Sequence, residues 1–130
     1  MDAGAGCEQC TDADAAIAWE RSRGFGFVAR IVDESHFFGS VQRCPSCSKN
    51  YALIFCETID WDNSDDPQYK LLIPLTATEA QSLAEAGEEA AEAALRHLSP
   101  RDYLLMERGS GAKDWSMYSL RGQIIVPPHD

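Results

Sequence analysis

RCPSCSKNYALIFCETI, residues 43–59, is the stretch of sequence that decides how this chain folds. It opens with Cys44 and Cys47, which two residues separate, and Pro45 stiffens the turn between them by fixing its own φ. A tight turn with this spacing aims two thiols at one point, where a single metal ion can hold both. The turn leads into Tyr51–Ile59, the most hydrophobic segment of the chain. The stretch therefore predicts a cysteine-bearing turn next to a central strand.

The predicted strand contains a fifth cysteine in an apolar setting. Successive side chains of a strand point to opposite faces of the sheet. The strand accordingly divides into one set of Ala52, Ile54 and Cys56 and another of Leu53 and Phe55. Because a free cysteine in such a run behaves as a small apolar residue, we predict that Cys56 is buried, unligated and unreactive toward thiol reagents.

A second pair of cysteines with the same spacing, Cys7 and Cys10, lies near the N-terminus. In a reducing compartment, paired Cys-x-x-Cys spacing favours metal ligation over disulfide bonds. Two such turns can complete a tetrahedral shell of four thiolates around zinc, with zinc–sulfur distances of about 2.3 Å. The sequence therefore predicts a structural Zn²⁺ held by Cys7, Cys10, Cys44 and Cys47.

The run Arg43–Cys47 between two predicted strands resembles the zinc knuckle of zinc-ribbon and treble-clef proteins. The resemblance covers Cys7–Cys10 and the residues around Cys44–Cys47. It implies a structural metal held between two knuckles, with these four cysteines in the ligand positions. Many zinc knuckles carry a glycine after the second cysteine, where this chain has Ser48.

Other interpretations of the cysteines stay open at this point. A redox Cys-x-x-Cys pair places its first thiol at a helix N-terminus, whereas Cys44 precedes a predicted strand. Cys44 and Cys47 could also be ordinary turn and core thiols, and His36 could replace a cysteine as ligand. A deaminase zinc site requires a His-x-Glu run and a proline directly before the first cysteine, but Arg43 stands there. No catalytic signature remains, so we expect no enzyme.

The central strand has predicted neighbours on its N-terminal side. Gly24–Val32 alternates in the manner of a strand. This pattern assigns to one face Phe25, Phe27, Ala29 and Ile31. Asp33–Ser35 then predicts a turn, and His36–Arg43 predicts a returning strand. The three strands form an antiparallel meander whose second turn carries two cysteines.

The C-terminal half predicts further strands around one main helix. Thr76 and Glu79 have the spacing of a capping box, which opens an acidic helix over residues 76–98. Gly87 weakens this helix by about 1 kcal/mol relative to alanine and can split it. The apolar stripe of the helix contains Ala80, Leu83, Ala84, Gly87, Ala91, Ala94, Leu95 and Leu98. The remaining segments predict a strand at Lys70–Pro74, a C-terminal hairpin of Tyr103–Arg108 and Trp115–Leu120, and a last strand at Ile124–Val126.

These elements predict an α+β fold in a single domain over residues 1–130, with residues 1–16 flexible apart from their two cysteines. The chain has 130 residues, with 11 Lys and Arg against 21 Asp and Glu, and a formal net charge of −10. Such a surface repels nucleic-acid phosphates and favours basic protein partners, although acidic charge also serves solubility alone. The chain has neither a membrane-length apolar run nor a secretory signal, so we expect a cytoplasmic protein.

Asp60–Tyr69 is predicted to be a polar, acid-rich loop, and the acidic part of this loop is the predicted partner surface. Its candidate contact residues are Asp60, Trp61, Asp62, Asp65 and Asp66. A tryptophan is a favoured interface anchor and an acidic rim selects basic partners. The alternative is a solvated loop with Trp61 packed on the core.

The sequence favours a non-enzymatic, zinc-stabilised interaction module, such as an adaptor, a regulator or an immunity-like inhibitor, that engages a basic protein surface. A nucleic-acid-associated zinc ribbon is the main alternative, and a thiol-redox protein is a third. The features that favour nucleic acid are four basic residues, Arg21, Arg23, Arg30 and Arg43.

Overall fold

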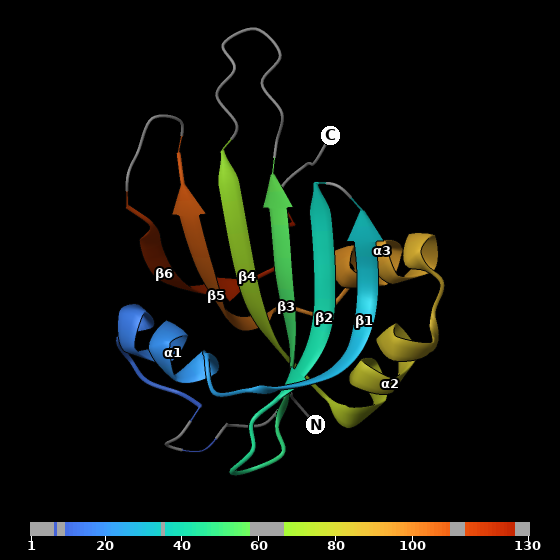
Figure 1. Cartoon of the computed structure of the whole chain (residues 1–130), viewed down its shortest axis with the longest axis horizontal. Coiled ribbons are helices and arrows are strands. Elements are labelled where there is room, and N and C mark those ends of the chain that lie inside the picture. The colour runs from blue at the N-terminus through green and yellow to red at the C-terminus, as the bar shows by residue number, and fades with distance from the viewer. Residues whose placement is uncertain (1–6, 8–9, 35, 58–66, 110–113, 127–130) are drawn as a thin grey trace, which may run out of the picture.

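The computed structural model describes residues 7, 10–34, 36–57, 67–109 and 114–126 of the chain. Within them lie three helices and a six-stranded sheet (Figure 1). The helices are α1 (Ala15–Ser22), α2 (Ala77–Glu85) and α3 (Glu88–Arg96). The strands are β1 (Gly26–Glu34), β2 (Phe37–Arg43), β3 (Asn50–Glu57), β4 (Gln68–Leu75), β5 (Arg101–Arg108) and β6 (Ser116–Gly122).

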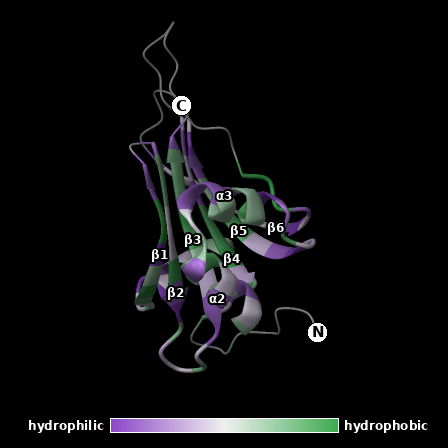
Figure 2. Cartoon of the chain, turned by 90° about the vertical axis from the view of Figure 1, so that its right-hand side faces the viewer, coloured by the Kyte–Doolittle hydropathy of each residue, from purple (hydrophilic) through white to green (hydrophobic). Residues whose placement is uncertain are grey.

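The sheet is an antiparallel meander in which each strand pairs with the next one in sequence. The predicted α+β class and the C-terminal hairpin, formed by β5 and β6, are therefore confirmed. Helices α2 and α3 pack against one face of the sheet, and α1 lies apart from them, against the other (Figures 1 and 2). None of the helices in the described ranges combines the length and apolarity needed to cross a membrane.

The alternation predicted for the central strand is confirmed in β3. Its inward set, which includes Ala52, Ile54 and Cys56, is fully buried beneath α2 and α3. Leu53 and Phe55 are half-buried on the opposite face. Burial raises the pKa of the Cys56 thiol to about 12. This matches the predicted position of Cys56, and its predicted lack of reactivity stays a prediction.

The predicted helix over residues 76–98 is two helices. Thr76 and Glu79 form the expected capping box at the start of α2. The helix ends at Glu85, because Ala86 is extended and Gly87, also extended, becomes the N-cap of α3. Of the predicted apolar stripe, the buried members are Ala80, Leu83, Ala91, Leu95 and Leu98, whereas Ala84, Gly87 and Ala94 are exposed. The second half of the predicted stripe therefore belongs to a separate helix, α3.

The alternation predicted for the first strand is wrong. Phe27 is 64% exposed, and the adjacent Ile31 and Val32 are both buried. The pairing of β1 with β2 contains two register shifts, one between Phe27 and Ala29 and one between Arg30 and Val32. Each irregularity inserts an unpaired residue and changes the face to which the following side chains point.

Other element boundaries also differ from the prediction. Helix α1 was not predicted as such, and β4 begins at Gln68, inside the segment predicted as loop. The predicted turn residues Asp33 and Glu34 belong to β1. Residues 124–126 form no strand, although Ile124 and Val126 are buried in the core beneath α2 and α3. Their burial explains the apolar pattern that predicted a strand.

Candidate metal centre

The second cysteine pair sits in the turn between β2 and β3, which starts after the Arg43–Asn50 pair. The Ser48 N–H donates to the Cys44 carbonyl at 2.9 Å, and the Cys44 N–H donates to the Lys49 carbonyl at 3.0 Å. Ser48 has a φ of 64°, the left-handed region that favours glycine. This conformation explains why glycine is common after the second cysteine of such turns, and Ser48 adopts it at a cost in strain.

The first cysteine pair lies in a compact turn before α1. The backbone N–H groups of Cys10 and Thr11 both donate to the Cys7 carbonyl at 3.1 Å. Arg21 of α1 donates to the Thr11 carbonyl at 3.0 Å and forms an ion pair with Asp12 at 3.5 Å. The helix therefore holds the first turn in place from its C-terminal end.

The structure brings the four predicted cysteines together. The Cys7 Sγ lies 3.9 Å from that of Cys10 and 3.7 Å from that of Cys44. The Cys10 Sγ lies 3.7 Å from that of Cys47, and all four sulfurs lie within 4.8 Å of one another. A tetrahedron with metal–sulfur distances of about 2.3 Å has sulfur–sulfur edges of about 3.8 Å. The cluster thus has the dimensions of a four-thiolate metal site.

The four thiols differ in their electrostatic surroundings. Burial raises the pKa of the Cys10 thiol to about 12. Burial acts in the same direction on Cys47, but backbone hydrogen bonds involving Lys49 and Cys7 outweigh it and lower the pKa of that thiol to about 7. Four thiolates gathered this closely would repel one another. A bound divalent cation would take the place of the thiol protons, and its positive charge would offset this repulsion.

Tyr51 supports the cluster from the sheet. Its hydroxyl donates to the Cys10 Sγ at 3.2 Å, and Phe25 stacks on its ring with the centroids 4.9 Å apart. Burial raises the Tyr51 pKa above its usual value, so the hydroxyl keeps its proton and remains a donor. Sequence reasoning missed this contact because the only signal was the nearness of Tyr51 to Cys47 along the chain.

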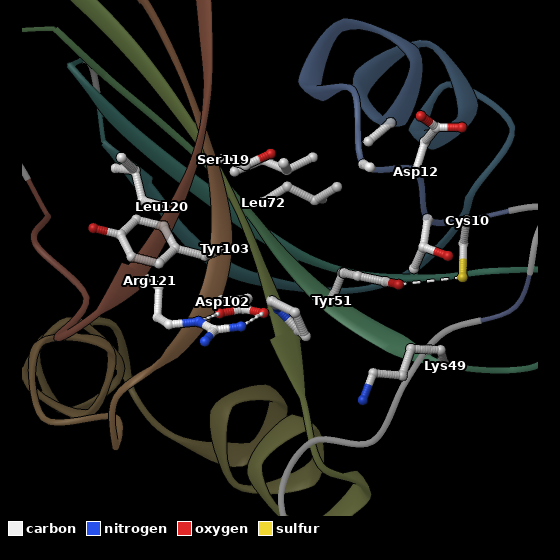
Figure 3. Close-up of a pocket in the computed structure, with 15 residues that line it drawn as sticks. Cys10, Asp12, Lys49, Tyr51, Leu72, Asp102, Tyr103, Ser119, Leu120 and Arg121 are labelled. Carbon is white, nitrogen blue, oxygen red and sulfur yellow. Dashed lines mark hydrogen bonds and ion pairs between the residues drawn. The ribbon is translucent and has the colours of Figure 1, made fainter.

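A cavity of about 530 Å³ adjoins the cluster (Figure 3). Cys10, Lys49 and Tyr51 line it near the cysteines, and the exposed Asp102–Arg121 ion pair lines it on β5 and β6. At one end of the cavity Tyr51 donates to Cys10, and at the other end Arg121 donates to Asp102. The cavity therefore borders the cysteine cluster at Cys10.

The remaining predicted site residues lie elsewhere. The His36 Nδ1 contacts the Glu57 Oε1 at 3.0 Å, so His36 is no substitute for a cysteine in the cluster. Three of the predicted basic residues form ion pairs with carboxylates, and the fourth, Arg43, donates to Asn50. The predicted partner residues Asp60, Trp61, Asp62, Asp65 and Asp66 lie outside the described residues.

A scan against protein-family models matches no family, and neither the curated proteins nor the solved structures match this chain. The cysteine cluster is therefore identified by its own geometry.

Proposed function

We propose that this chain is a non-enzymatic, zinc-stabilised module that binds a basic protein surface. The observation that carries the proposal is the cluster of Cys7, Cys10, Cys44 and Cys47. Three of its sulfur–sulfur distances are 3.7–3.9 Å, the edge length of tetrahedral ligation, and all four sulfurs lie within 4.8 Å of one another. Among common metals, four thiolates in tetrahedral geometry select zinc or iron. Zinc is favoured because two short Cys-x-x-Cys turns are its usual structural ligand set.

A zinc ion in this cluster would be structural. Four cysteine ligands fill a tetrahedral shell and leave no open position for water or substrate. The ion would join the segment before α1, through Cys7 and Cys10, to the β2–β3 turn, through Cys44 and Cys47. Because such a site forms only in the folded chain, metal binding would add directly to the folding free energy.

The charge of the chain supports a basic partner. The net charge is −10, and Glu85, Glu88 and Glu89 are exposed on α2 and α3. With the acidic segment around Asp60–Asp66, these groups would speed the encounter with a positively charged protein surface. Nucleic acid is the weaker candidate, because Arg21, Arg23 and Arg30 are already paired with carboxylates.

Metal analysis of the chain purified without chelator tests the first part of the proposal. We expect one zinc per chain, and Cys44→Ser should lose it while Cys56→Ser, at a cysteine outside the cluster, should retain it. Zinc below about 0.2 equivalents per chain would overturn the metal assignment.

Binding to immobilised polylysine and to duplex DNA, each over a series of salt concentrations, tests the second part. We expect salt-sensitive binding to polylysine and none to DNA. Replacing Asp65 and Asp66 by lysine should slow the association, since charges at the rim of an interface mainly set the on-rate. The matched control replaces Glu20 and Asp33, whose carboxylates already pair with arginines. Preference for DNA would overturn this part.

A further inference from the structure

The sheet face that carries α1 is only partly covered. Five residues, one from each of β2 to β6, form a continuous row across this face: Phe38, Phe55, Lys70, Met106 and Met117. Four of the five are apolar. Phe38 is 38% exposed and Met117 is 37% exposed, so this row is open at both ends.

This row is the floor of a groove. A cavity of about 480 Å³ lies over it, and Trp19, Arg23 and Phe25 form the wall on the α1 side. Four strand spacings of about 4.8 Å make the row about 19 Å long, the length of about six residues of extended chain. Phenylalanine and methionine make a floor that adapts to different apolar side chains, because methionine is flexible and polarisable.

Lys70 lines the groove, and its positive charge lies near that of Arg108, which stands just outside the lining: both contact the ring of Trp115. The Lys70 Nζ lies 5.0 Å from the centre of the Trp115 ring, and the Arg108 guanidinium carbon lies 5.1 Å from the same centre. Six other arginines in the described ranges pair with carboxylates: Arg21, Arg23, Arg30, Arg96, Arg101 and Arg121. Lys70 and Arg108 have no such partner within the part of the chain that the structure describes.

Two positive charges at one indole ring raise the local positive potential, which favours an anion. Arg108 is oriented by its hydrogen bond to Gln68, which in turn donates to the Glu57 Oε2 at 2.9 Å. Arg108 also acts electrostatically on Glu57, which lies on the far side of Gln68 in this chain of contacts. A carboxylate that approached Lys70 or Arg108 would form charge-assisted hydrogen bonds with it.

We infer that this groove binds a short acidic and apolar segment of a partner protein. An apolar side chain of the segment occupies the floor between Phe38 and Met117, and a neighbouring carboxylate pairs with Lys70 and Arg108. The length of the floor favours a segment of chain over a single small molecule, and the charges of Lys70 and Arg108 select an acidic one. The inference goes beyond the proposed function, since it assigns a second binding surface with the opposite charge preference.

Three matched peptides of ten residues test the inference by fluorescence anisotropy on the full zinc-loaded chain. The first peptide carries Leu and Phe flanked by Asp and Glu. The second keeps Leu and Phe but replaces the acids by Lys, and the third keeps the acids but replaces Leu and Phe by Ser. We expect the first peptide to bind at least about tenfold more tightly than the other two. It alone offers apolar side chains to the floor and carboxylates to Lys70 and Arg108.

Variants with matched controls locate the binding. Lys70→Met removes the charge and keeps the length of the side chain, and Phe38→Ser removes part of the floor. Each should weaken the first peptide about tenfold. Arg30→Met and Ile125→Ser remove a positive charge and a large apolar side chain from exposed positions that do not line the cavity, and should leave binding unchanged.

Methionine labelled with ¹³C at its methyl group supplies a readout that is independent of variants. The chain contains three methionines. The signals of Met106 and Met117, which line the cavity, should shift on addition of the first peptide.

Several results would overturn the inference. Equal affinity for the first and third peptides, or unmoved Met106 and Met117 signals, would show that the apolar floor is not used. Preference for the lysine peptide with no effect of Lys70→Met would overturn the groove but support the basic partner of the proposed function. Binding of free decanoate as tight as that of the first peptide would show a site for small amphiphiles rather than for a protein segment.

Discussion

The two faces of the sheet are built in different ways. On one face, α2 and α3 cover a continuous core in which Ile54, Leu71, Ile73 and Leu95 are fully buried. On the other face, the single eight-residue helix α1 packs mainly through Trp19, next to two of the clustered cysteines. An isolated helix of this length is marginal in water. The comparison indicates that apolar packing holds the first face, whereas the cysteine cluster and α1 lie together on the second.

The largest expected effect follows from the proposed metal site: without a bound ion, the α1 face should lose stability before the face covered by α2 and α3. Chelation or Cys44→Ser should lower the free energy of unfolding by about 4 kcal/mol or more, as loss of a structural metal does. Hydrogen exchange should lose protection first in α1, because Cys7 and Cys10 no longer tie its N-terminal side to the β2–β3 turn. The amides of β3 and β4 should stay protected longer.

Cys56→Ser is the matched control, because Cys56 lies under α2 and α3 and outside the cluster. This substitution should lower the free energy of unfolding by about 1–3 kcal/mol, because it buries a hydroxyl without a hydrogen-bond partner. Hydrogen-exchange protection should then fall by a similar factor in α1 and in the rest of the chain. Equal loss of protection over both faces in Cys44→Ser would contradict the comparison.

Two adjacent residues of β3 compare the packing of the faces directly. Ile54 is fully buried under α2 and α3, and Leu53 is half-buried on the α1 face. Ile54→Ala should cost about 3 kcal/mol or more, because it removes buried methyl groups and leaves a cavity. Leu53→Ala should cost about 1 kcal/mol. Urea unfolding of the zinc-loaded variants measures both, and equal costs would mean that the α1 face is packed as tightly as the other.

The α2 face should show its own dependence on pH through Glu79. Hydrogen bonds from Arg101, at 2.6 and 2.7 Å, outweigh desolvation and hold the pKa of Glu79 below its ordinary value of 4.5. Because the folded pKa is the lower one, the stabilisation is fully present above pH 4.5 and is lost as the pH falls through the folded pKa.

Glu79→Gln should therefore lower stability at pH 7 by about 1 kcal/mol, through loss of the charged cap and ion pair, and have less effect at pH 3. Urea unfolding at several pH values between 3 and 7 measures the difference. Glu85→Gln changes an exposed carboxylate of the same helix and serves as control. An equal loss at pH 3 and pH 7 would show that the Glu79 charge is not involved.

The smallest effect concerns the turn that carries Cys44 and Cys47. Ser48→Gly should raise stability by about 1 kcal/mol, because Ser48 has a φ of 64° and glycine adopts this conformation without strain. Ser46→Gly, at an exposed position in the same turn, should give no such gain. Thermal unfolding of the zinc-loaded chain measures the change. If both variants lose stability, the entropy that glycine loses on folding outweighs any strain that is relieved at Ser48.

Much of the fold follows from local patterns. The Cys-x-x-Cys spacings, the capping box of Thr76 and Glu79, and the alternation that buries Cys56 depend on interactions over a few residues, and all three are present in the structure. The irregularities of β1 were not predictable in this way. They follow from how Phe27 and Val32 meet β2, a contact between separate parts of the chain.

The amino-acid sequence by itself determined which groups this protein can use: four cysteines in two short turns, an excess of acidic residues, and Cys56 as a buried thiol apart from those four. It could do so because ligand spacing, net charge and strand alternation are properties of the chain before it folds. Only the tertiary structure decided that Cys7 lies 3.7 Å from Cys44, that Tyr51 supports Cys10, and that Lys70 and Arg108 meet at one tryptophan. These contacts join residues far apart in sequence, and the register of the sheet, rather than any local pattern, brings them together.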